Sequence, residues 1–292
     1  SKDLIERGND MRLMRVGPEG NAKPVVLHTD GTMREISGLV GDLSGGSLSL
    51  EMIDAIRGSD IDHLPVIPEG ERIGACLADV PNFHCVGLNY VNHAKETGAK
   101  IPEEPILFWK ATSALSGPFD PIPVPEDSDK LDYEVELGIV IGRECSYVSE
   151  AEALDYVTGY CTINDVSERT FQTARGGLWG KGKSAPGFGP VGPQLVTADE
   201  AGNVMSLRVT TKVNGETRQN SNTSDMIFSV REIISYMSRF MALQPGDIIA
   251  TGTPEGVAMG MKPQRWLKPG DVMRVGVQGL GEQKQNVVAY PG

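Results

Sequence analysis

The chain has 292 residues, a net charge of −12, 39% hydrophobic residues and 23% charged residues. This length allows one large domain or a domain with a small companion, and the composition is typical of a globular protein with a buried core. No basic run offsets the negative charge, which argues against general nucleic-acid binding and against contact with anionic membranes. The sequence has neither the roughly 18 consecutive apolar residues of a transmembrane helix nor a signal peptide, so we expect a cytoplasmic protein.

The cysteines are scattered along the chain without the paired spacing of a zinc site or the density of a disulfide framework. Free, buried thiols in a reducing compartment are the expected state of Cys76, Cys85, Cys145 and Cys161. The 35 glycines and 19 prolines favour a protein rich in strands and loops over a helical bundle.

The N-terminal part of the chain predicts short strands and turns. The β-branched run Pro24–His28 precedes Asp30-Gly31, which is a strong signal for a hairpin turn. A helix is expected over Ser47–Arg57. Residues 1–10 precede Met11 and are left out of the fold prediction.

Prolines and glycines punctuate the stretch from Pro65 to Pro81, a composition typical of a connector. We place a domain boundary within it. The prediction is a small N-terminal domain of residues 1–75 and a larger domain of residues 76–292.

The stretch Leu131–Gly142, LDYEVELGIVIG, predicts a half-buried strand, because apolar and acidic side chains alternate in its first half. The acidic face carries Asp132, Glu134 and Glu136. Carboxylates this close repel one another unless a cation neutralises them, and hard divalent cations prefer oxygen ligands. A solvated face is also common in antiparallel sheets, so the pattern alone leaves both interpretations open.

The segment Phe83–Gly98 begins as a strand and then takes on a helical pattern. His93 and Glu96 are three residues apart, so on a helix they share a face and can form a hydrogen bond. A histidine held by a carboxylate is typical of a general base, although an ordinary surface pair has the same spacing. Further on, Lys110 ends an apolar strand and could point into a site or toward water.

Other local signals mark helices and turns. Ser-x-x-Glu capping boxes predict helix starts at Ser149–Glu152 and at Ser229–Glu232. After the second box, apolar residues recur at helical spacing as far as Met241, which indicates a helix packed on the core. Asn214-Gly215 predicts a hairpin.

Two loops have the composition of ligand-binding loops. Residues 176–192 carry seven glycines together with Lys183, but they lack the spacing and the following helix of a phosphate-binding loop. Residues 252–256, GTPEG, are rich in backbone N–H groups and include Thr253. Such a loop can bind a carboxylate or can simply connect two strands.

Five stretches, in this order, resemble signatures of the fumarylacetoacetate hydrolase family: GLNYVNHAKE, LDYEVELGIVIGR, INDVSERTFQ, GKGKS…GFGPVGP and LQPGDIIATGTPEGV. The resemblance covers about residues 80–290. It implies an α+β, β-rich fold with a mixed β-sheet roll or sandwich and a small N-terminal domain, a divalent cation that is Mg²⁺ or Mn²⁺, and a homodimer or higher homo-oligomer. The chain departs from the family pattern at Thr170 and at Ala185-Pro186-Gly187, which affects the substrate assignment more than the metal site.

Carried over position by position, the resemblance implies a role for each site residue. The implied metal ligands are Glu134, Glu136 and Asp165, and Asp132 is left out of the ligand set. The implied catalytic residues are His93 and Glu96, which activate water, and Lys183, which stabilises an enolate. The implied substrate-binding residues are Arg169, Gln172, Lys183 and Thr253.

The reaction that the resemblance implies is metal-dependent hydrolysis of the C3–C4 bond of a 2,4-dioxo acid to pyruvate and a second carboxylic acid. The stretch GGLWGKGKS…GFGPVGP resembles the branch that acts on sugar-acid breakdown products such as 2,4-diketo-3-deoxy-L-rhamnonate, which would give lactate as the second acid. We expect the substrate tail near residues 110–120 or 220–225. The alternatives are oxaloacetate decarboxylation, tautomerisation, isomerisation or lyase chemistry on the same residues, and, in another class, a non-catalytic metal- or ligand-binding protein.

Overall fold

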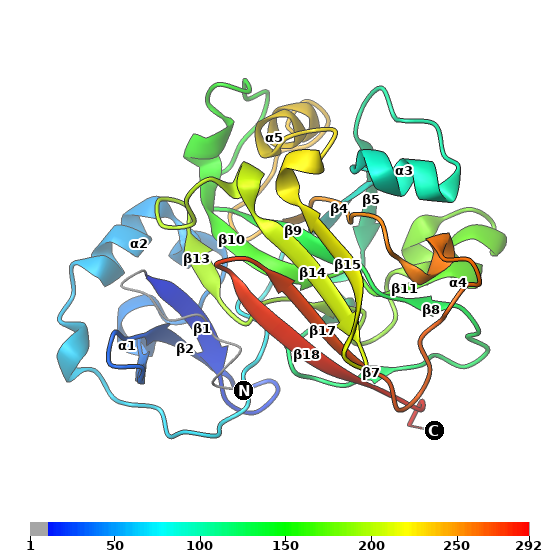
Figure 1. Cartoon of the computed structure of the whole chain (residues 1–292). Coiled ribbons are helices and arrows are strands. Elements are labelled where there is room, and N and C mark those ends of the chain that lie inside the picture. Colours follow the sequence, from blue (N-terminus) through cyan, green and yellow to red (C-terminus); the bar gives the residue numbers. More distant parts are fainter. Residues whose placement is uncertain (1–10, 292) are drawn as a thin grey trace.

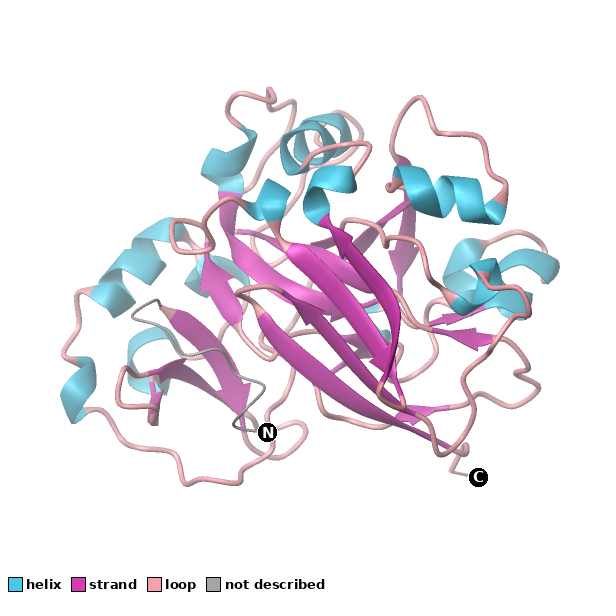
Figure 2. Cartoon of the chain, in the orientation of Figure 1, coloured by secondary structure: helices cyan, strands magenta, loops and turns pink. Residues whose placement is uncertain are grey.

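The computed structural model describes residues 11–291, which form a strand-rich fold with short helices (Figure 2). In spatial order, the larger sheet contains β3 (Met33–Glu35), β2 (Lys23–Leu27), β1 (Arg12–Val16), β13 (Leu195–Thr197), β10 (Val157–Asn164), β9 (Val135–Ile141), β16 (Ile248–Ala250), β4 (Phe83–Gly87) and β5 (Ile106–Lys110). The second sheet contains β15 (Glu216–Asn222), β14 (Arg208–Val213), β17 (Val272–Val277), β18 (Gly281–Val288) and β7 (Ile122–Pro123). Two short pairs complete the strands: β8 (Leu131–Asp132) with β11 (Ser167–Glu168), and β6 (Leu115–Ser116) with β12 (Gly189–Pro190).

The helices lie mostly around the rims of the sheets (Figure 1). The α-helices are α1 (Ser37–Val40), α2 (Leu50–Arg57), α3 (Val91–Thr97), α4 (Arg169–Ala174) and α5 (Val230–Met237). The 3₁₀ turns are η2 (Gly45–Leu48), η3 (Ile61–His63), η4 (Thr112–Ala114), η5 (Ala153–Tyr156), η6 (Trp179–Gly182), η7 (Val204–Ser206), η8 (Thr223–Asp225) and η9 (Ala258–Gly260). Within residues 11–291, no helix has the length and apolar character needed to cross a lipid bilayer.

The two sheets pack on each other around β9, β10, β14 and β17 (Figure 1). Neighbouring strands are antiparallel except for β4 with β16, β6 with β12 and β7 with β18, so the sheets are mixed. Along β9, Val135, Leu137 and Ile139 enter the core between the sheets, whereas Val140 enters a second core on the opposite face. The architecture confirms the predicted β-rich α+β fold.

The predicted strand Leu131–Gly142 is interrupted and is fully buried, so the expectation of one continuous, half-buried strand is wrong. It divides into β8 and β9 around Tyr133 and Glu134. The backbone of Glu134 leaves the ladder because its N–H donates to Asn164 Oδ1 at 3.1 Å and its carbonyl accepts from the N–H of Asp165 at 2.9 Å. The acidic face therefore meets other protein groups, and a solvated face is excluded.

Most of the local signals hold, with one exception. The capping box at Ser229 and Glu232 starts α5 as predicted, and Asn214-Gly215 turns between β14 and β15 with positive φ angles. The box at Ser149 and Glu152 does not start an α-helix. Its two side chains bond to each other at 2.5 Å, and a single 3₁₀ turn, η5, follows.

The N-terminal strands are continuous with the larger sheet, because β1 pairs with β13. The hairpin predicted at Asp30-Gly31 joins β2 to β3, and α2 lies within the predicted helix Ser47–Arg57. Leu13 and Val26 share a core with Phe83 of β4. The division of the chain into domains at residue 75 stays a prediction. As expected, the four cysteines are buried and free.

Candidate active site

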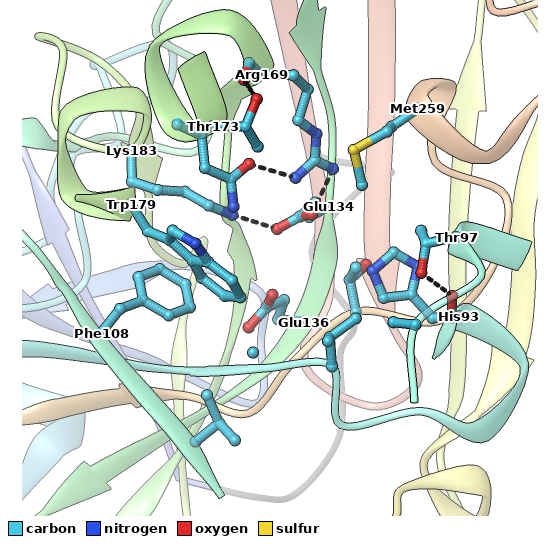
Figure 3. Close-up of a pocket in the computed structure, with 16 residues that line it drawn as sticks. His93, Thr97, Phe108, Glu134, Glu136, Arg169, Thr173, Trp179, Lys183 and Met259 are labelled. Atoms are coloured by element: carbon cyan, nitrogen blue, oxygen red, sulfur yellow. Dashed lines mark hydrogen bonds and ion pairs between the residues drawn. The ribbon is translucent and has the colours of Figure 1, made fainter. Parts of the chain in front are cut away.

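A cavity of about 190 Å³ opens between α3, the start of β9, α4 and η6 (Figure 3). Seven of the nine side chains proposed from the sequence line it: His93, Glu134, Glu136, Arg169, Gln172, Lys183 and Thr253. The other two contact this group. Glu96 bonds to His93, and Asp165 is completely buried and bonds to Lys183.

Three acidic side chains converge because two antiparallel strands meet here. Glu136 lies on β9 opposite Ile163 of β10, and Asp165 follows the last residue of β10. Glu134 occupies the irregular link before β9. Each carboxylate offers one oxygen, and these oxygens lie within 4.8 Å of one another. The structure thus brings together the three metal ligands predicted from the sequence, in a spacing that one cation can bridge.

Two buried lysines contact Asp165 from different directions. Lys183 Nζ donates to Asp165 Oδ2 at 2.7 Å and to Glu134 Oε2 at 2.6 Å. Lys110 Nζ pairs with Asp165 Oδ1 and donates to the carbonyl of Val166 at 3.2 Å. Lys110, whose direction the sequence left open, therefore points into the protein and belongs to the site.

Arg169 links the acidic residues to the wall of the cavity. Its Nε donates to Asp132 Oδ2 at 2.9 Å, and its terminal nitrogens donate to Glu134 Oε1 at 2.5 Å and to Gln172 Oε1 at 3.0 Å. Asp132 also accepts from the backbone of the η9 turn. Asp132 is thus engaged by protein donors, away from the three carboxylates that converge.

The cluster carries more acidic than basic groups. Four carboxylates, at Asp132, Glu134, Glu136 and Asp165, face three cations, at Lys110, Arg169 and Lys183, and each of the seven is at most 5% exposed. In the part of the chain that the structure describes, Glu136 forms no ion pair and accepts a hydrogen bond from the N–H of Gly252 at 2.7 Å. One buried negative charge is therefore left without a protein cation.

The electrostatics locate this imbalance at Glu136. Burial raises the pKa of the Glu136 carboxyl well above its ordinary value, and the neighbouring Asp165 and Glu134 raise it further. Burial would also raise the pKa of Glu134, but Arg169 and Lys183 outweigh it and hold that pKa below its ordinary value. A divalent cation among these oxygens would supply the missing charge, so the residues fit the metal that the sequence predicts.

The histidine pair is positioned as a general base requires. His93 Nδ1 lies 2.9 Å from Glu96 Oε1 on α3, which confirms the contact predicted from their spacing. Glu96 Oε2 in turn accepts the N–H of Gly256 at 3.0 Å. A Glu96 carboxylate fixed at both oxygens favours the tautomer of His93 that carries its proton on Nδ1, and in that tautomer Nε2 is the nitrogen that can accept a proton.

The segment after β16 uses its N–H groups differently from the expectation for a carboxylate-binding loop. The N–H groups of Gly252 and Gly256 are taken by Glu136 and Glu96, which are carboxylates of the protein itself. Thr253 Oγ1 donates to the carbonyl of Val135 at 3.0 Å and accepts from Gln219 Nε2 at 2.8 Å. Contact between Thr253 and a substrate carboxylate stays a prediction.

The rest of the cavity wall is largely apolar, and sequence reasoning missed it. It is formed by Val86, Leu88, Phe108, Trp179 and Met259. None of residues 110–120 or 220–225 lines the cavity, so the expected position of the tail-binding loops is wrong. The one available signal was Phe108, two residues before Lys110 on β5 and therefore on the same face.

These features define a class: a β-rich enzyme fold that directs a buried acidic triad and a histidine–glutamate pair into one small cavity. Residues 82–288 match the family model for the C-terminal domain of fumarylacetoacetate hydrolase, and the chain belongs to the fumarylacetoacetate hydrolase family.

Similar proteins extend over almost the whole chain. A relative from Burkholderia lata, provisionally named a hydrolase, is 50% identical over 277 residues, which are 94% of this chain and 98% of the relative. The fumarylacetoacetate hydrolase of Exiguobacterium antarcticum is 38% identical, with a TM-score of 0.81 and coverage of 96% of this chain and 99% of that one. A 5-carboxymethyl-2-hydroxymuconate delta-isomerase from Mycobacterium smegmatis is 32% identical, with a TM-score of 0.76 and coverage of 97% and 100%. The same fold therefore carries proteins named for hydrolysis and for isomerisation.

Proposed function

We propose that this chain is a metal-dependent hydrolase that cleaves the C3–C4 bond of a 2,4-dioxo acid and releases pyruvate and a second carboxylic acid. One observation carries the proposal: Glu134 and Glu136 of the acidic triad with its unbalanced charge line the same cavity as His93, which Glu96 holds. A cation site with a general base beside it suits the hydrolysis of a ketone.

Glu134, Glu136 and Asp165 would hold the cation, which is Mg²⁺ or Mn²⁺ in this proposal. When bound, it acts as a Lewis acid that polarises the substrate's carbonyl oxygens. The triad also explains why three protein cations surround it, since Lys110, Lys183 and Arg169 reduce the repulsion among carboxylates that must stay ionised.

His93 Nε2 removes a proton from a water molecule, and the resulting hydroxide adds to the C4 carbonyl carbon. Glu96 keeps the proton of the imidazole on Nδ1 and stabilises the imidazolium that forms. The C3–C4 bond then breaks, and its electron pair moves to C3 to give the enolate of pyruvate. Return of the proton from His93 to C3 completes pyruvate, and C4 leaves in the second carboxylic acid.

Lys183 stabilises the negative charge of the enolate. Its ammonium group has three N–H donors, and Glu134 and Asp165 accept two of them. Burial alone would lower the pKa of Lys183, but Asp165 and Glu134 raise it above its ordinary value, so the side chain stays charged. A fixed cation at this position contributes without reorganisation during the reaction. In this proposal Arg169, Gln172 and Thr253 bind the oxygens of the substrate.

The substrate tail is short in this proposal, because the cavity is small and largely walled by apolar side chains. A C4 acyl group of lactate size, as in 2,4-diketo-3-deoxy-L-rhamnonate, remains the proposed natural tail from the resemblance of the glycine-rich stretch. The apolar wall favours a methyl or ethyl group at its end over a longer polyol. Homodimer formation is likewise proposed from the resemblance alone.

Pyruvate release from a panel of 2,4-dioxo acids tests the function. The panel runs from acetylpyruvate to 2,4-diketo-3-deoxy sugar acids, each with Mg²⁺, with Mn²⁺ and with a chelator. We expect metal-dependent release of pyruvate in step with the second acid. Failure to cleave any member would reject the hydrolase proposal.

Isomerisation or decarboxylation is the second candidate, and the full-length similarity to an isomerase favours it specifically. These reactions also pass through an enolate but need no attacking water. Exchange of C3 protons in solvent D₂O, or turnover of oxaloacetate, without cleavage of any dioxo acid would select this alternative.

A further inference from the structure

A second hollow adjoins the catalytic cavity. This surface cleft of about 720 Å³ lies between α3 and the η9 turn. The two spaces share Thr97 and Met259 as lining residues. The Thr97 hydroxyl donates to the carbonyl of His93 at 2.9 Å, so this short side chain is folded back onto its own helix. Met259 is therefore the long side chain that separates the cavity from the cleft.

The backbone of Met259 is fixed from below by Asp132. The N–H of Met259 donates to Asp132 Oδ2 at 3.1 Å, and the N–H of Ala258 donates to Oδ1 at 2.8 Å. These donors begin the η9 turn, where no preceding helical carbonyl can accept them. The same carboxylate accepts from Arg169 Nε at 2.9 Å. Asp132 therefore links the turn that carries Met259 to Arg169 in the wall of the cavity.

The turn is also held from the side of α3. A Cβ atom placed on Gly260 would lie 2.4 Å from the carboxyl carbon of Glu96, so the turn passes directly against the catalytic pair. Figure 3 shows the Met259 side chain entering the cavity beside Arg169 and His93, across from Phe108 and Trp179. Because its backbone is held in this way, the Met259 side chain projects from a fixed point and forms a defined wall.

The cleft beyond this wall differs chemically from the cavity. Lys95, Lys262 and Glu96 contribute to its lining, whereas the cavity on the other side of Met259 is walled mainly by apolar groups. The carboxylate of Glu96 is already bonded to His93 and to the N–H of Gly256, and the amide of Gln264 donates to the carbonyl of Met259 at 2.9 Å. The two ammonium groups are therefore the donors suited to a carboxylate. A substrate whose tail ended in a carboxylate would find these donors only if Met259 were out of the way.

We propose that Met259 is the residue that determines specificity for the distal end of the substrate. It restricts the natural substrate to a short tail and keeps a tail-end carboxylate out of the lysine-lined cleft. The inference rests on the proposed function, because it assumes that the carboxylate and 2-oxo group bind at the acidic triad. Shortening Met259 joins the two spaces and gives a longer tail a path to Lys95 and Lys262.

The kinetic test compares acetylpyruvate with a 2,4-dioxo acid whose longer tail ends in a carboxylate. We compare kcat/KM for the long acid with kcat/KM for acetylpyruvate. In Met259→Ala we expect the ratio of the two values to rise about 10- to 200-fold, which is the discrimination typical of one contact in a hydrophobic pocket. Met261→Ala is the matched control, because Met261 lines the cleft but not the cavity. Met259→Leu, which preserves bulk, should keep the wild-type ratio. An unchanged ratio in a folded Met259→Ala protein would overturn the proposal.

A binding test separates this inference from the reaction. Oxamate offers the same carboxylate and adjacent carbonyl but cannot be cleaved, and its N-carboxyalkyl derivatives add the tail. By calorimetry, Met259→Ala should bind the derivative at least tenfold more tightly than wild type and oxamate itself equally well. Adding Lys262→Gln should reverse the gain. If Met259→Ala binds the derivative more tightly but no dioxo acid is cleaved, the inference about Met259 stands and the hydrolase proposal is rejected. If acetylpyruvate is cleaved but Met259→Ala has no effect in either test, the hydrolase proposal stands and the inference about Met259 is rejected.

Discussion

Two buried polar networks meet at consecutive residues where β10 ends. Asn164 belongs to a network of neutral amides, in which its Nδ2 donates to Gln285 Oε1 at 3.3 Å and Gln285 Nε2 donates to Gln283 Oε1 at 2.8 Å. The next residue, Asp165, belongs to the charged cluster of the cavity and pairs with two lysines. All of these side chains are buried.

The difference between the networks is charge balance. The amides carry no net charge, and Gln283 also reaches the carbonyl of Thr162 at 2.8 Å, so this region joins the strands of the two sheets. The charged cluster is left with one excess carboxylate, at Glu136. A neutral, satisfied network is complete as folded, whereas the charged cluster requires either a proton on Glu136 or a bound cation to balance its charge.

The largest expected effect comes from a substitution beside the charged cluster that removes activity and leaves the fold unchanged. His93→Ala should lower turnover about 10²- to 10⁴-fold, the typical contribution of a general base, while Mg²⁺ affinity measured by calorimetry stays unchanged. His63→Ala is the control, because His63 pairs with Asp60 at the same spacing but is exposed. Undiminished hydrolysis in His93→Ala would remove His93 from the mechanism.

Lys110→Met should cost about 3–5 kcal/mol of unfolding free energy in chelator, because it leaves the buried Asp165 with one cation fewer. Lys100→Met, which breaks an exposed pair with Glu103, should cost at most about 1 kcal/mol. Urea unfolding measures both. Equal costs would mean that the buried pair contributes no more than a surface pair.

The neutral network should respond in stability alone. Gln283→Leu removes a buried N–H donor from the carbonyls of Thr162, Pro190 and Gly192, and should cost about 1–3 kcal/mol of unfolding free energy with kcat nearly unchanged. Gln278→Leu on the exposed turn between β17 and β18 serves as the control. A large loss of kcat in Gln283→Leu at temperatures where it is folded would show that the networks are not separate.

The smallest effect concerns the pH dependence of stability without metal. The folded pKa of Glu136 is raised above its ordinary value of 4.5, so its contribution to stability is present below that pH and is lost as pH rises toward the folded pKa. Glu136→Gln resembles the protonated form. In chelator it should therefore become more stable than wild type as pH rises from about 5 to 8.

Mg²⁺ should reverse this order, because it stabilises the folded wild type by binding to it. Denaturant midpoints across the pH series provide the measurement. A constant difference at every pH would argue that Glu136 is not the unbalanced group.

The sequence predicted those parts of the site that depend on local periodicity. Period two placed Glu134 and Glu136 together, and the three-residue spacing paired His93 with Glu96. The interruption of the strand escaped notice because the alternation continues through Tyr133. What breaks the ladder is Asn164, a residue 30 positions further along the chain from Glu134.

Features set by distant segments could not be predicted from local patterns. The inward direction of Lys110 follows from Asp165, 55 residues away, and the position of Met259 follows from Asp132, 127 residues away. The burial of Asp132, Glu134 and Glu136 could not be predicted for the same reason. An alternating strand with acidic side chains on one face is expected to expose that face to solvent unless the elements that cover it are known.

The stretch from Gly252 to Met259 has a consequence for how such enzymes diversify. Glu136, Glu96 and Asp132 hold it entirely through backbone N–H groups. A Cβ at Gly256 would lie 2.0 Å from a backbone oxygen, so this position must stay glycine. These contacts are independent of the Met259 side chain, whereas Thr253 is also held through its hydroxyl, which donates to the carbonyl of Val135. Natural drift or directed evolution can therefore exchange Met259 at the cavity and try new substrates while the catalytic frame stays in place.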